Sequence, residues 1–262
     1  MVAYMMLKGK VIVITGSTKG IGKGIAMKAI EEGAQVVASG PEPELIKALE
    51  REFADNDYTG IAVLCDVTKK TDVENLMLTA SKKYGKIDGL VACAGIVDPG
   101  HFEDIDEARW DRLMDVNLKG VYLANQAVLP YLKKNQGGKI VNVGSDCSLE
   151  GWDFMTSYCA SKFAVRGLTQ ALAKELGKYN INVNVICPGI IETDMWEQVD
   201  KTLGELKGLK QGETWKQTVA KIPLGRGGKP LDIGNGVVML LSEYADYITG
   251  CSLTVGGGSA IH

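Results

Sequence analysis

The sequence predicts an α/β fold, a single domain in which a doubly wound parallel sheet carries helices on both faces. Short β-branched runs alternate with stretches of helical period along the chain. The runs are almost continuously apolar, which is typical of strands covered on both sides. No Pro/Gly/Ser-rich linker interrupts this alternation over residues 1–262. A chain of this length could form one domain or two, and the unbroken alternation favours one.

The expected elements follow one another in a regular order. The first helix follows the first strand, and its apolar residues Ile21, Ile25 and Ala29 share one face, with Gly33 placed for a left-handed C-cap. A later helix is expected over residues 157–179, with Thr156 or Ser157 as its N-cap. Six strands are expected, over residues 11–15, 35–38, 61–65, 89–93, 140–143 and 181–186.

One segment, residues 194–222, departs from this order. It is more charged and less regular than its surroundings. We expect a pair of short helices there that cover part of the domain. In an open parallel sheet, the crevice at the carboxyl ends of the strands is the place where ligands bind and a cover is useful. The segment is therefore predicted to close over a ligand.

Charge and hydropathy exclude several classes of partner. The 29 basic and 32 acidic residues nearly balance, and no block of like charges occurs, so neither nucleic acid nor an anionic membrane is an expected partner. No apolar run approaches the length of a membrane span. The first ten residues lack the pattern of a signal peptide. We expect a cytoplasmic protein that acts on a small molecule.

The cysteines and histidines do not predict a metal site. The six cysteines show no CxxC spacing, and the two histidines are His101 and His262. We interpret the cysteines as small buried hydrophobic residues in a reducing compartment.

A glycine-rich loop joins the first strand to the first helix. Its sequence is Gly16-Ser17-Thr18-Lys19-Gly20-Ile21-Gly22. Glycines there let the chain turn sharply and let a pyrophosphate approach the backbone at the positive end of a helix. A turn of this kind can also be glycine-rich for steric reasons alone.

With Thr15 in front, this loop resembles the TGxxxGxG loop of the short-chain dehydrogenase/reductase family. The other landmarks of that family follow in order over nearly the whole chain: Asp66-Val67, Asn117, Ser145, Tyr158, Lys162, Pro188-Gly189, and Ile191 to Met195. The resemblance implies a Rossmann-type fold and hydride transfer between a nicotinamide cofactor and an alcohol or ketone. Two positions depart from the family: Cys93 replaces an asparagine and Gly256 an aspartate.

The resemblance implies four catalytic residues. Tyr158 would exchange a proton with the substrate oxygen, and Ser145 would hydrogen-bond the same oxygen. Lys162, four residues from Tyr158 on the expected helix, would lower the pKa of the phenol from about 10 and hold the nicotinamide ribose. Asn117 would hold a water in the proton relay.

The resemblance also implies a binding site for NAD or NADP. At the end of the second strand, Glu42 and Glu44 would repel a 2′-phosphate and Lys19 would attract one, although both glutamates could equally be a solvated helix start. We favour NAD. The implied contacts are Gly16, Ser17, Thr18, Lys19, Gly20, Ile21, Gly22, Ser39, Asp66, Val67, Ala94, Gly95, Tyr158, Lys162, Pro188, Gly189, Ile191 and Thr193.

The substrate class rests on the residues around the expected pocket. The stretches 195–200 and 222–226 resemble members that act on polyols or on small hydroxyketones and diols, and less closely hydroxysteroid dehydrogenases. A non-catalytic cofactor sensor built on the same fold is the alternative from another class of protein. The resemblance also implies a homo-oligomer, a homotetramer or a homodimer. The expected substrate contacts are Val97, His101, Cys147, Trp152, Phe154, Met195 and Trp196. Trp196 and Trp215 could instead anchor the cover to the domain.

Overall fold

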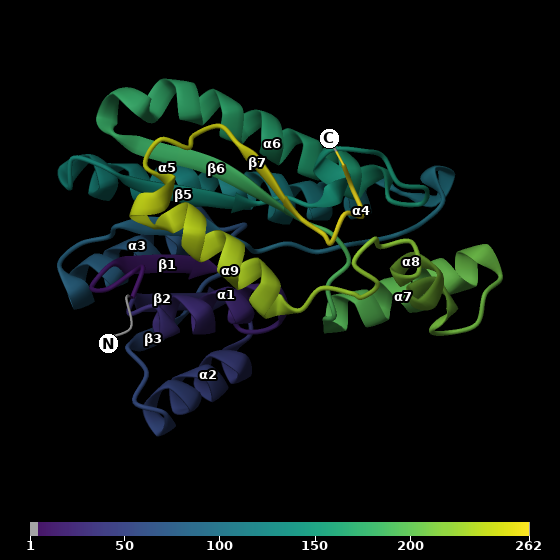
Figure 1. The fold of residues 1–262 in the computed structure, drawn as a ribbon, viewed down its shortest axis with the longest axis horizontal. Coiled ribbons are helices and arrows are strands. Elements are labelled where there is room, and N and C mark those ends of the chain that lie inside the picture. Colours follow the sequence, from purple (N-terminus) through teal and green to yellow (C-terminus); the bar gives the residue numbers. More distant parts are fainter. Residues whose placement is uncertain (1–4, 262) are drawn as a thin grey trace.

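The computed structural model describes residues 5–261, and within them seven parallel strands form one sheet in the order β3-β2-β1-β4-β5-β6-β7 (Figure 1). The sequence-predicted limits at residues 1 and 262, and His262, lie outside the described residues. The strands are β1 Val11–Thr15, β2 Gln35–Gly40, β3 Gly60–Leu64, β4 Gly89–Ala92, β5 Gly138–Val143, β6 Ile181–Pro188 and β7 Ser252–Val255. The six expected strands are present; β1 has the expected bounds, and the other five differ from them at one or both ends.

The seventh strand, β7, was not expected from the sequence. It is only four residues long and only partly buried, because it lies at the edge of the sheet and pairs with β6 alone. Its sequence, Ser-Leu-Thr-Val, therefore lacks the continuous apolar run that marks the strands inside the sheet.

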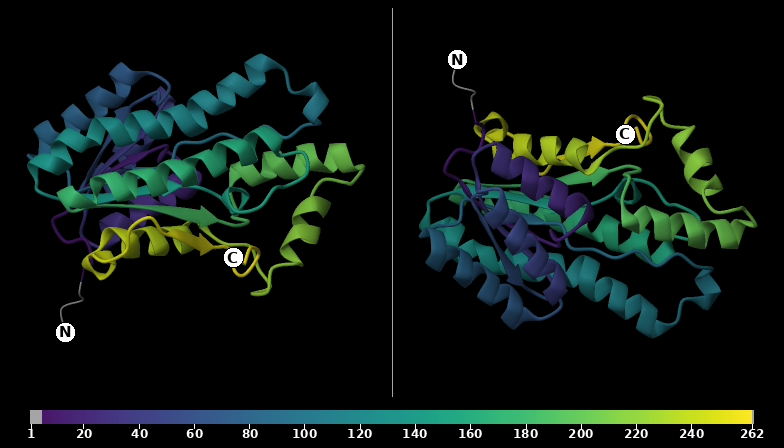
Figure 2. Two further views of the ribbon diagram at one scale, coloured as in Figure 1. Left: turned by 90° about the horizontal axis from the view of Figure 1, so that it is seen from above. Right: turned by 90° about the horizontal axis from the view of Figure 1, so that it is seen from below.

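Helices cover both faces of the sheet, as Figure 2 shows. On one face lie α1 Gly20–Glu31, α2 Pro43–Asp55 and α9 Pro230–Leu241. On the other lie α3 Lys70–Tyr84, α5 Gly120–Lys134 and α6 Thr156–Leu176. Successive strand residues alternate between the two cores: Ile12 and Ile14 of β1 pack on the first side and Val13 on the second. The doubly wound α/β prediction is confirmed.

The ends of two helices test the expectations made from the sequence. Gly33 follows α1 with a φ of 84°, the left-handed conformation expected for it. The expected cap of α6 is wrong: the helix begins at Thr156, its cap residue is Met155, and within the described chain no side chain caps it. Thr156 and Ser157 are already helical, because the Cys159 N–H donates to the Met155 carbonyl at 2.8 Å.

The segment 194–222 contains the two expected helices, α7 Asp194–Lys207 and α8 Glu213–Val219. Both lie beyond the carboxyl ends of the strands (Figure 1). A short helix, α4 Glu107–Met114, follows the loop after β4. No helix among residues 5–261 has the length and apolar character needed to span a membrane.

Candidate active site

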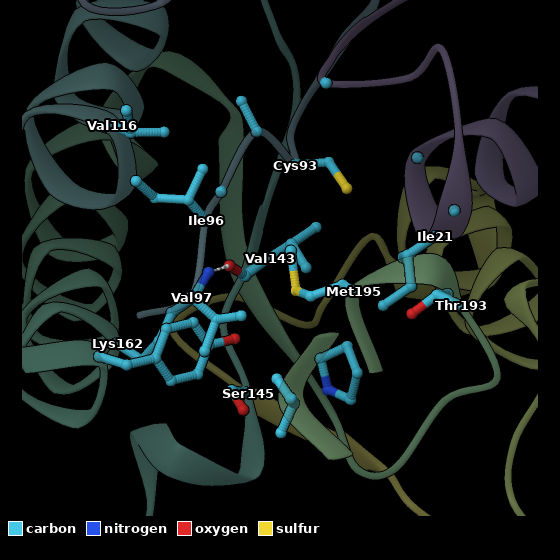
Figure 3. A pocket seen from close by; sticks show the side chains of 18 of the residues that line it. Ile21, Cys93, Ile96, Val97, Val116, Val143, Ser145, Lys162, Thr193 and Met195 are labelled. Carbon is cyan, nitrogen blue, oxygen red and sulfur yellow. Dashed lines mark hydrogen bonds between the residues drawn. The ribbon is translucent and has the colours of Figure 1, made fainter. Parts of the chain in front are cut away.

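A cleft of about 1070 Å³ opens at the carboxyl ends of the strands. Residues that follow β1, β2, β3, β4, β5 and β6 line it, together with α6 and α7. Figure 3 shows Ile21 and Thr193 on one side of the cleft and Val97, Ser145 and Lys162 on the other. The strand order reverses between β1 and β4, because β2 and β3 lie on one side of β1 and β4 to β7 lie on the other; this is the switch point where ligands bind in open α/β sheets.

Most of the sequence-predicted site residues line this one cleft. Three do not, namely Ser17, Ser39 and Asn117. Those that do are Gly16, Thr18, Lys19, Gly20, Ile21, Gly22, Asp66, Val67, Ala94, Gly95, Ser145, Tyr158, Lys162, Pro188, Gly189, Ile191 and Thr193.

The glycine loop is built for close backbone approach. Gly16 has a φ of 63°, and a Cβ there would lie 2.5 Å from the Ala94 Cα, so a side chain is excluded. The first turn of α1 carries no acidic residue, and within the described chain no side chain caps it at Lys19. Its N–H groups are therefore available to an anion such as a pyrophosphate.

Ser17 and Ser39 lie beneath the loop rather than in the cleft. Both are fully buried. The Ser17 hydroxyl donates to the Ile14 carbonyl at 2.9 Å and accepts the Ser39 N–H at 2.9 Å. These bonds hold the loop on the ends of β1 and β2, so the two serines position the backbone that lines the cleft.

The two glutamates after β2 have different positions. Glu42 lines the cleft and its Oε1 lies 3.3 Å from the Lys19 Nζ. Glu44 is exposed, pairs with Lys47 at 3.3 Å and does not line the cleft. Only Glu42 can therefore act on a ligand there, and it also neutralises the one lysine of the loop.

Ser145, Tyr158 and Lys162 come together where β5 ends beside α6. The Lys162 Nζ donates to the Val143 carbonyl at 2.8 Å and lies 5.6 Å from the centre of the Tyr158 ring. The Ser145 hydroxyl donates to the Asp146 Oδ1 at 2.8 Å. A hydroxyl, a phenol and an ammonium thus converge on one apolar pocket.

Burial sets the protonation of these groups. Burial raises the pKa of Tyr158, and a hydrogen bond with Ser145 opposes that rise. Burial lowers the pKa of Lys162, because the ammonium loses water in a site where it is 3% exposed. At neutral pH the phenol therefore keeps its proton.

Asn117 braces the loop after β4 from a five-residue π-helical segment, Asp115–Lys119. Its Oδ1 accepts the Ile96 N–H at 2.8 Å, and its Nδ2 donates to the Ile96 carbonyl at 2.9 Å and to the Ser161 hydroxyl at 3.2 Å. π-Helical turns are rare and occur frequently at functional sites. The sequence carries no pattern that would have predicted this turn.

The two departures from the family pattern fit their surroundings. The N–H groups of Cys93 and Ala94 both donate to the Thr15 hydroxyl, at 3.1 and 3.3 Å, which joins β4 to β1. Gly256 lies against Gly189, where an added Cβ on Gly189 would come within 2.8 Å of the Gly256 Cα. Neither position holds a proton-transfer group.

The far part of the cleft is apolar and only partly matches the expected substrate contacts. Val97, Cys147, Trp152, Met195 and Trp196 line it. His101 and Phe154 do not line it. Their rings pack edge to face instead, with centroids 5.1 Å apart.

The two tryptophans of the cover differ in position. Trp196 lines the cleft, whereas Trp215 does not. The two rings pack edge to face with centroids 5.7 Å apart. Trp215 therefore anchors α8 against α7, and Trp196 both joins that contact and faces the cleft.

Two features of the cleft were missed from the sequence. Asp146 is 4% exposed, and its Oδ2 has no hydrogen-bond partner among residues 5–261. Arg109 forms a two-point ion pair with Asp98, at 2.8 and 2.9 Å, that ties α4 to the loop after β4. Asp146 directly follows Ser145, a residue of the family pattern, which is the one signal that could have indicated it.

Residues 5–261 contain no group of three or more His, Cys, Asp or Glu side chains that could hold a metal ion.

The family model described as short chain dehydrogenase matches residues 10–204, more than half of the chain. The chain belongs to the short-chain dehydrogenase/reductase family. It is accordingly an NAD(P)-dependent alcohol dehydrogenase or ketoreductase of the short-chain type.

Its relatives in this family act on varied substrates. The chain is 37% identical to 3-oxoacyl-(acyl-carrier-protein) reductase of Thermotoga maritima, over 98% of this chain and 100% of the relative. It is 35% identical to a diacetyl reductase, (S)-acetoin forming, of Staphylococcus epidermidis, over 95% and 98%. It is 36% identical to galactitol 2-dehydrogenase of Agrobacterium fabrum, over 97% and 99%. A 3alpha-hydroxysteroid dehydrogenase of Mediterraneibacter gnavus is also 36% identical, over 98% and 99%.

A solved structure of this family has the same fold. The 3-ketoacyl-(acyl-carrier-protein) reductase from Brucella melitensis, complexed with NADH, matches with a TM-score of 0.86 and 32% identity. The match covers 97% of this chain and 100% of that one. The backbone donors, the glycines without side chains and the depth of the cleft fit a dinucleotide of this kind.

Proposed function

We propose that this enzyme transfers a hydride between a nicotinamide and the carbon of a secondary alcohol or ketone, with Tyr158 as the general acid and base. The observation that carries the proposal is the convergence of Ser145, Tyr158 and Lys162 on the cleft that the glycine loop also lines. Each of these side chains alone would be unremarkable on a helix or after a strand. Together with a dinucleotide loop they form a proton-transfer site.

The chain's own residues bind and orient the cofactor and the substrate. The glycine loop and the start of α1 would hold the pyrophosphate, and Thr193, Ile191 and Pro188 line the same cleft. The nicotinamide supplies or accepts the hydride at its C4. The apolar wall, including Val97 and Met195, excludes water from the reacting carbon.

Tyr158 is in the state that carbonyl reduction requires. Because burial raises its pKa, the phenol holds a proton that it can donate to the substrate oxygen. Ser145 hydrogen-bonds the same oxygen. For alcohol oxidation the proton moves the other way, and the Lys162 ammonium, 5.6 Å from the centre of the ring, stabilises the phenolate.

The substrate we propose is a polyol or a small hydroxyketone or diol. The names of the diacetyl reductase and galactitol 2-dehydrogenase relatives support this choice, as do residues 195–200 and 222–226. An apolar cluster that lines the cleft also favours a second candidate, a hydroxysteroid, since Trp152, Met155 and Val199 offer contacts to a larger apolar ring system.

Replacing Tyr158 by Phe tests the catalytic assignment. We expect cofactor binding to persist and turnover to fall by about 10²- to 10⁴-fold, the usual contribution of a positioned acid or base. Turnover is measured by absorbance of the reduced nicotinamide with polyols, diols, sterols and their ketones. Tyr179→Phe, in the 3-10 turn that follows α6, serves as the control.

Near wild-type turnover in Tyr158→Phe would show that another group transfers the proton. If the wild-type enzyme turned over no compound of the panel with either cofactor, the result would instead favour a cofactor sensor built on the same fold.

We further propose a preference for NAD. Glu42 lines the cleft at the end of β2, where the family recognises the adenosine ribose, and a carboxylate there can accept a ribose hydroxyl but repels a 2′-phosphate. Lys19 would attract that phosphate, and its ion pair with Glu42 weakens this attraction.

We propose that the enzyme forms a homotetramer through contacts made by α5 and α6, or a homodimer through contacts made by one of these two helices. Tyr122 on α5 and Phe163 on α6 are both more than two-fifths exposed, which supports a contact there. The six cysteines, all within the described residues, are free, and this supports a cytoplasmic location.

A further inference from the structure

Two cysteines flank the catalytic residues and contact each other. Cys147 lies two residues after Ser145, in the 3-10 turn Asp146–Ser148, and Cys159 directly follows Tyr158 in the first turn of α6. Both belong to one apolar cluster and are 2% and 7% exposed. The thiols lie close enough for an interaction between them to shift their pKa values in opposite directions.

The surroundings make the two sulfurs unlike. The Trp152 N–H donates to the Cys159 Sγ at 3.4 Å. The hydrogen bond from Cys147, together with this amide, lowers the pKa of Cys159 to about 7, although burial opposes the shift. The same hydrogen bond, together with burial, raises the pKa of Cys147. Cys159 is therefore the more acidic of the two thiols.

Other cysteines of the chain lack this arrangement. Burial raises the pKa of Cys65 and of Cys93 to about 12, so both stay protonated and unreactive. Cys147 lines the cleft and Cys159 does not, so a small solute that enters the cleft reaches the pair from the Cys147 side. The two cysteines thus contact each other, one of them has a lowered pKa, and the pair can be reached from the cleft.

We propose that Cys147 and Cys159 form an oxidisable dithiol that closes to a disulfide when a peroxide enters the cleft, and that the disulfide reversibly inactivates the enzyme. The Cys159 thiolate attacks one peroxide oxygen and breaks the O–O bond, which gives a sulfenic acid and hydroxide. The Cys147 sulfur then attacks the sulfenic sulfur and displaces water. Two cysteines are oxidised, and one peroxide is reduced to two waters.

The loss of activity follows from geometry. A sulfur–sulfur bond is much shorter than a thiol–thiol hydrogen bond, so its formation draws the turn after β5 toward α6. Ser145 lies at the start of this turn, and Tyr158 lies in the first turn of α6. A misplacement of about 1 Å in such a pair can cost about 10²-fold in rate.

The test treats the reduced, full-length enzyme with hydrogen peroxide and follows activity and covalent state together. Trypsin leaves both cysteines in one peptide, residues 140–162, so cleavage after Glu150 is used to separate them. We expect the peptides that contain Cys147 and Cys159 to remain linked until reduced, and turnover to fall about 10²-fold and return with dithiothreitol. Bound cofactor and substrate should slow the reaction, because they fill the cleft.

Cys159→Ser and Cys251→Ser form the matched pair of variants, each compared with its own untreated rate. Cys251 lies outside the cleft, so its variant should respond to peroxide as the wild type does. Cys159→Ser should lose the linked peptides and the reversible inactivation. Equal reversible inactivation in Cys159→Ser, or linkage of other cysteines first, would overturn the proposal.

The covalent readout is independent of the function proposed above, whereas the activity readout rests on it. Linked peptides without any loss of turnover would refute the inactivation even if the catalytic assignment is correct. A failure of Tyr158→Phe to lose turnover would leave the disulfide assignment unaffected.

Discussion

At the scale of single residues, Asp146 is the least expected member of the site. Its Oδ1 accepts hydrogen bonds from the Ser145 hydroxyl and the Cys147 N–H, both at 2.8 Å. Its Oδ2 has no partner within the described chain, and burial raises its pKa. A carboxylate with one satisfied and one unsatisfied oxygen is costly when ionised.

Asp146 makes stability depend on pH. Because its pKa is higher in the folded protein than the value of about 3.9 expected when unfolded, the folded state holds the proton more tightly. Its contribution to stability is thus largest below that unfolded value and is lost as pH rises through the raised folded pKa. Each pKa unit is worth about 1.4 kcal/mol.

Asp146→Asn should remove this dependence, because asparagine keeps an oxygen acceptor and does not ionise. Relative to the variant, the wild type should lose stability as pH rises above about 4. Urea denaturation midpoints at a series of pH values measure this, with Asp55→Asn on the exposed end of α2 as control. Parallel pH profiles for wild type and Asp146→Asn would contradict the expectation.

At the scale of elements, the cover depends on one carboxylate. Asp200 of α7 is buried and accepts the N–H groups of Gly212 and Trp215, the latter at 2.7 Å. Gly212 has no side chain and a φ of 86°, so α8 cannot cap its own start. Asp200 therefore caps α8 from the neighbouring helix.

Asp200→Ala should loosen α8 while the nucleotide end of the cleft stays intact. Leaving buried N–H donors without a partner costs about 1–3 kcal/mol each. We expect faster amide exchange over residues 208–222 and a raised KM for the substrate, with cofactor affinity unchanged. Asp200→Asn, which keeps one oxygen acceptor, should show an amide exchange rate and a KM between those of the wild type and Asp200→Ala. Unchanged exchange in Asp200→Ala would show that Trp215 packing alone holds the cover.

At the scale of the whole molecule, cofactor binding couples to global stability. The cleft draws residues from the ends of six strands and from both helical layers, so a ligand that fills it stabilises the folded chain as a unit. The presence or absence of the 2′-phosphate on the bound ribose therefore changes the free energy of unfolding of the entire protein.

NAD should raise the melting temperature more than NADP at equal concentration. At about 100 times Kd, a ligand adds about 2.7 kcal/mol, which for a chain of this size is a rise of about 5–10 °C. Glu42→Gln should narrow the gap between NAD and NADP, whereas Glu44→Gln, outside the cleft, should leave it unchanged. Thermal scans with each cofactor measure both. An equal or larger rise with NADP in the wild type would reverse the assigned preference.

The sequence by itself determined the alternation of strands and helices and the order of the family landmarks. Both are local: a buried strand must be apolar on successive residues, and a glycine loop must lie between a strand and a helix. The fold class, strands β1 to β6 and the grouping of Ser145, Tyr158 and Lys162 could be predicted on these grounds. The edge strand β7 could not, because its Ser-Leu-Thr-Val sequence has no continuous apolar run, whereas the other edge strand, β3, keeps one in Ile-Ala-Val-Leu.

Only the tertiary structure decided which polar groups face the cleft and which support it. Ser17, Ser39 and Asn117 belong to the motifs, yet their hydrogen bonds to backbone groups keep them behind the lining. The contact of Cys147 with Cys159, and the cap that Asp200 supplies to α8, join residues on separate elements. Such pairings depend on how the elements pack against one another, and spacing along the chain does not encode that packing.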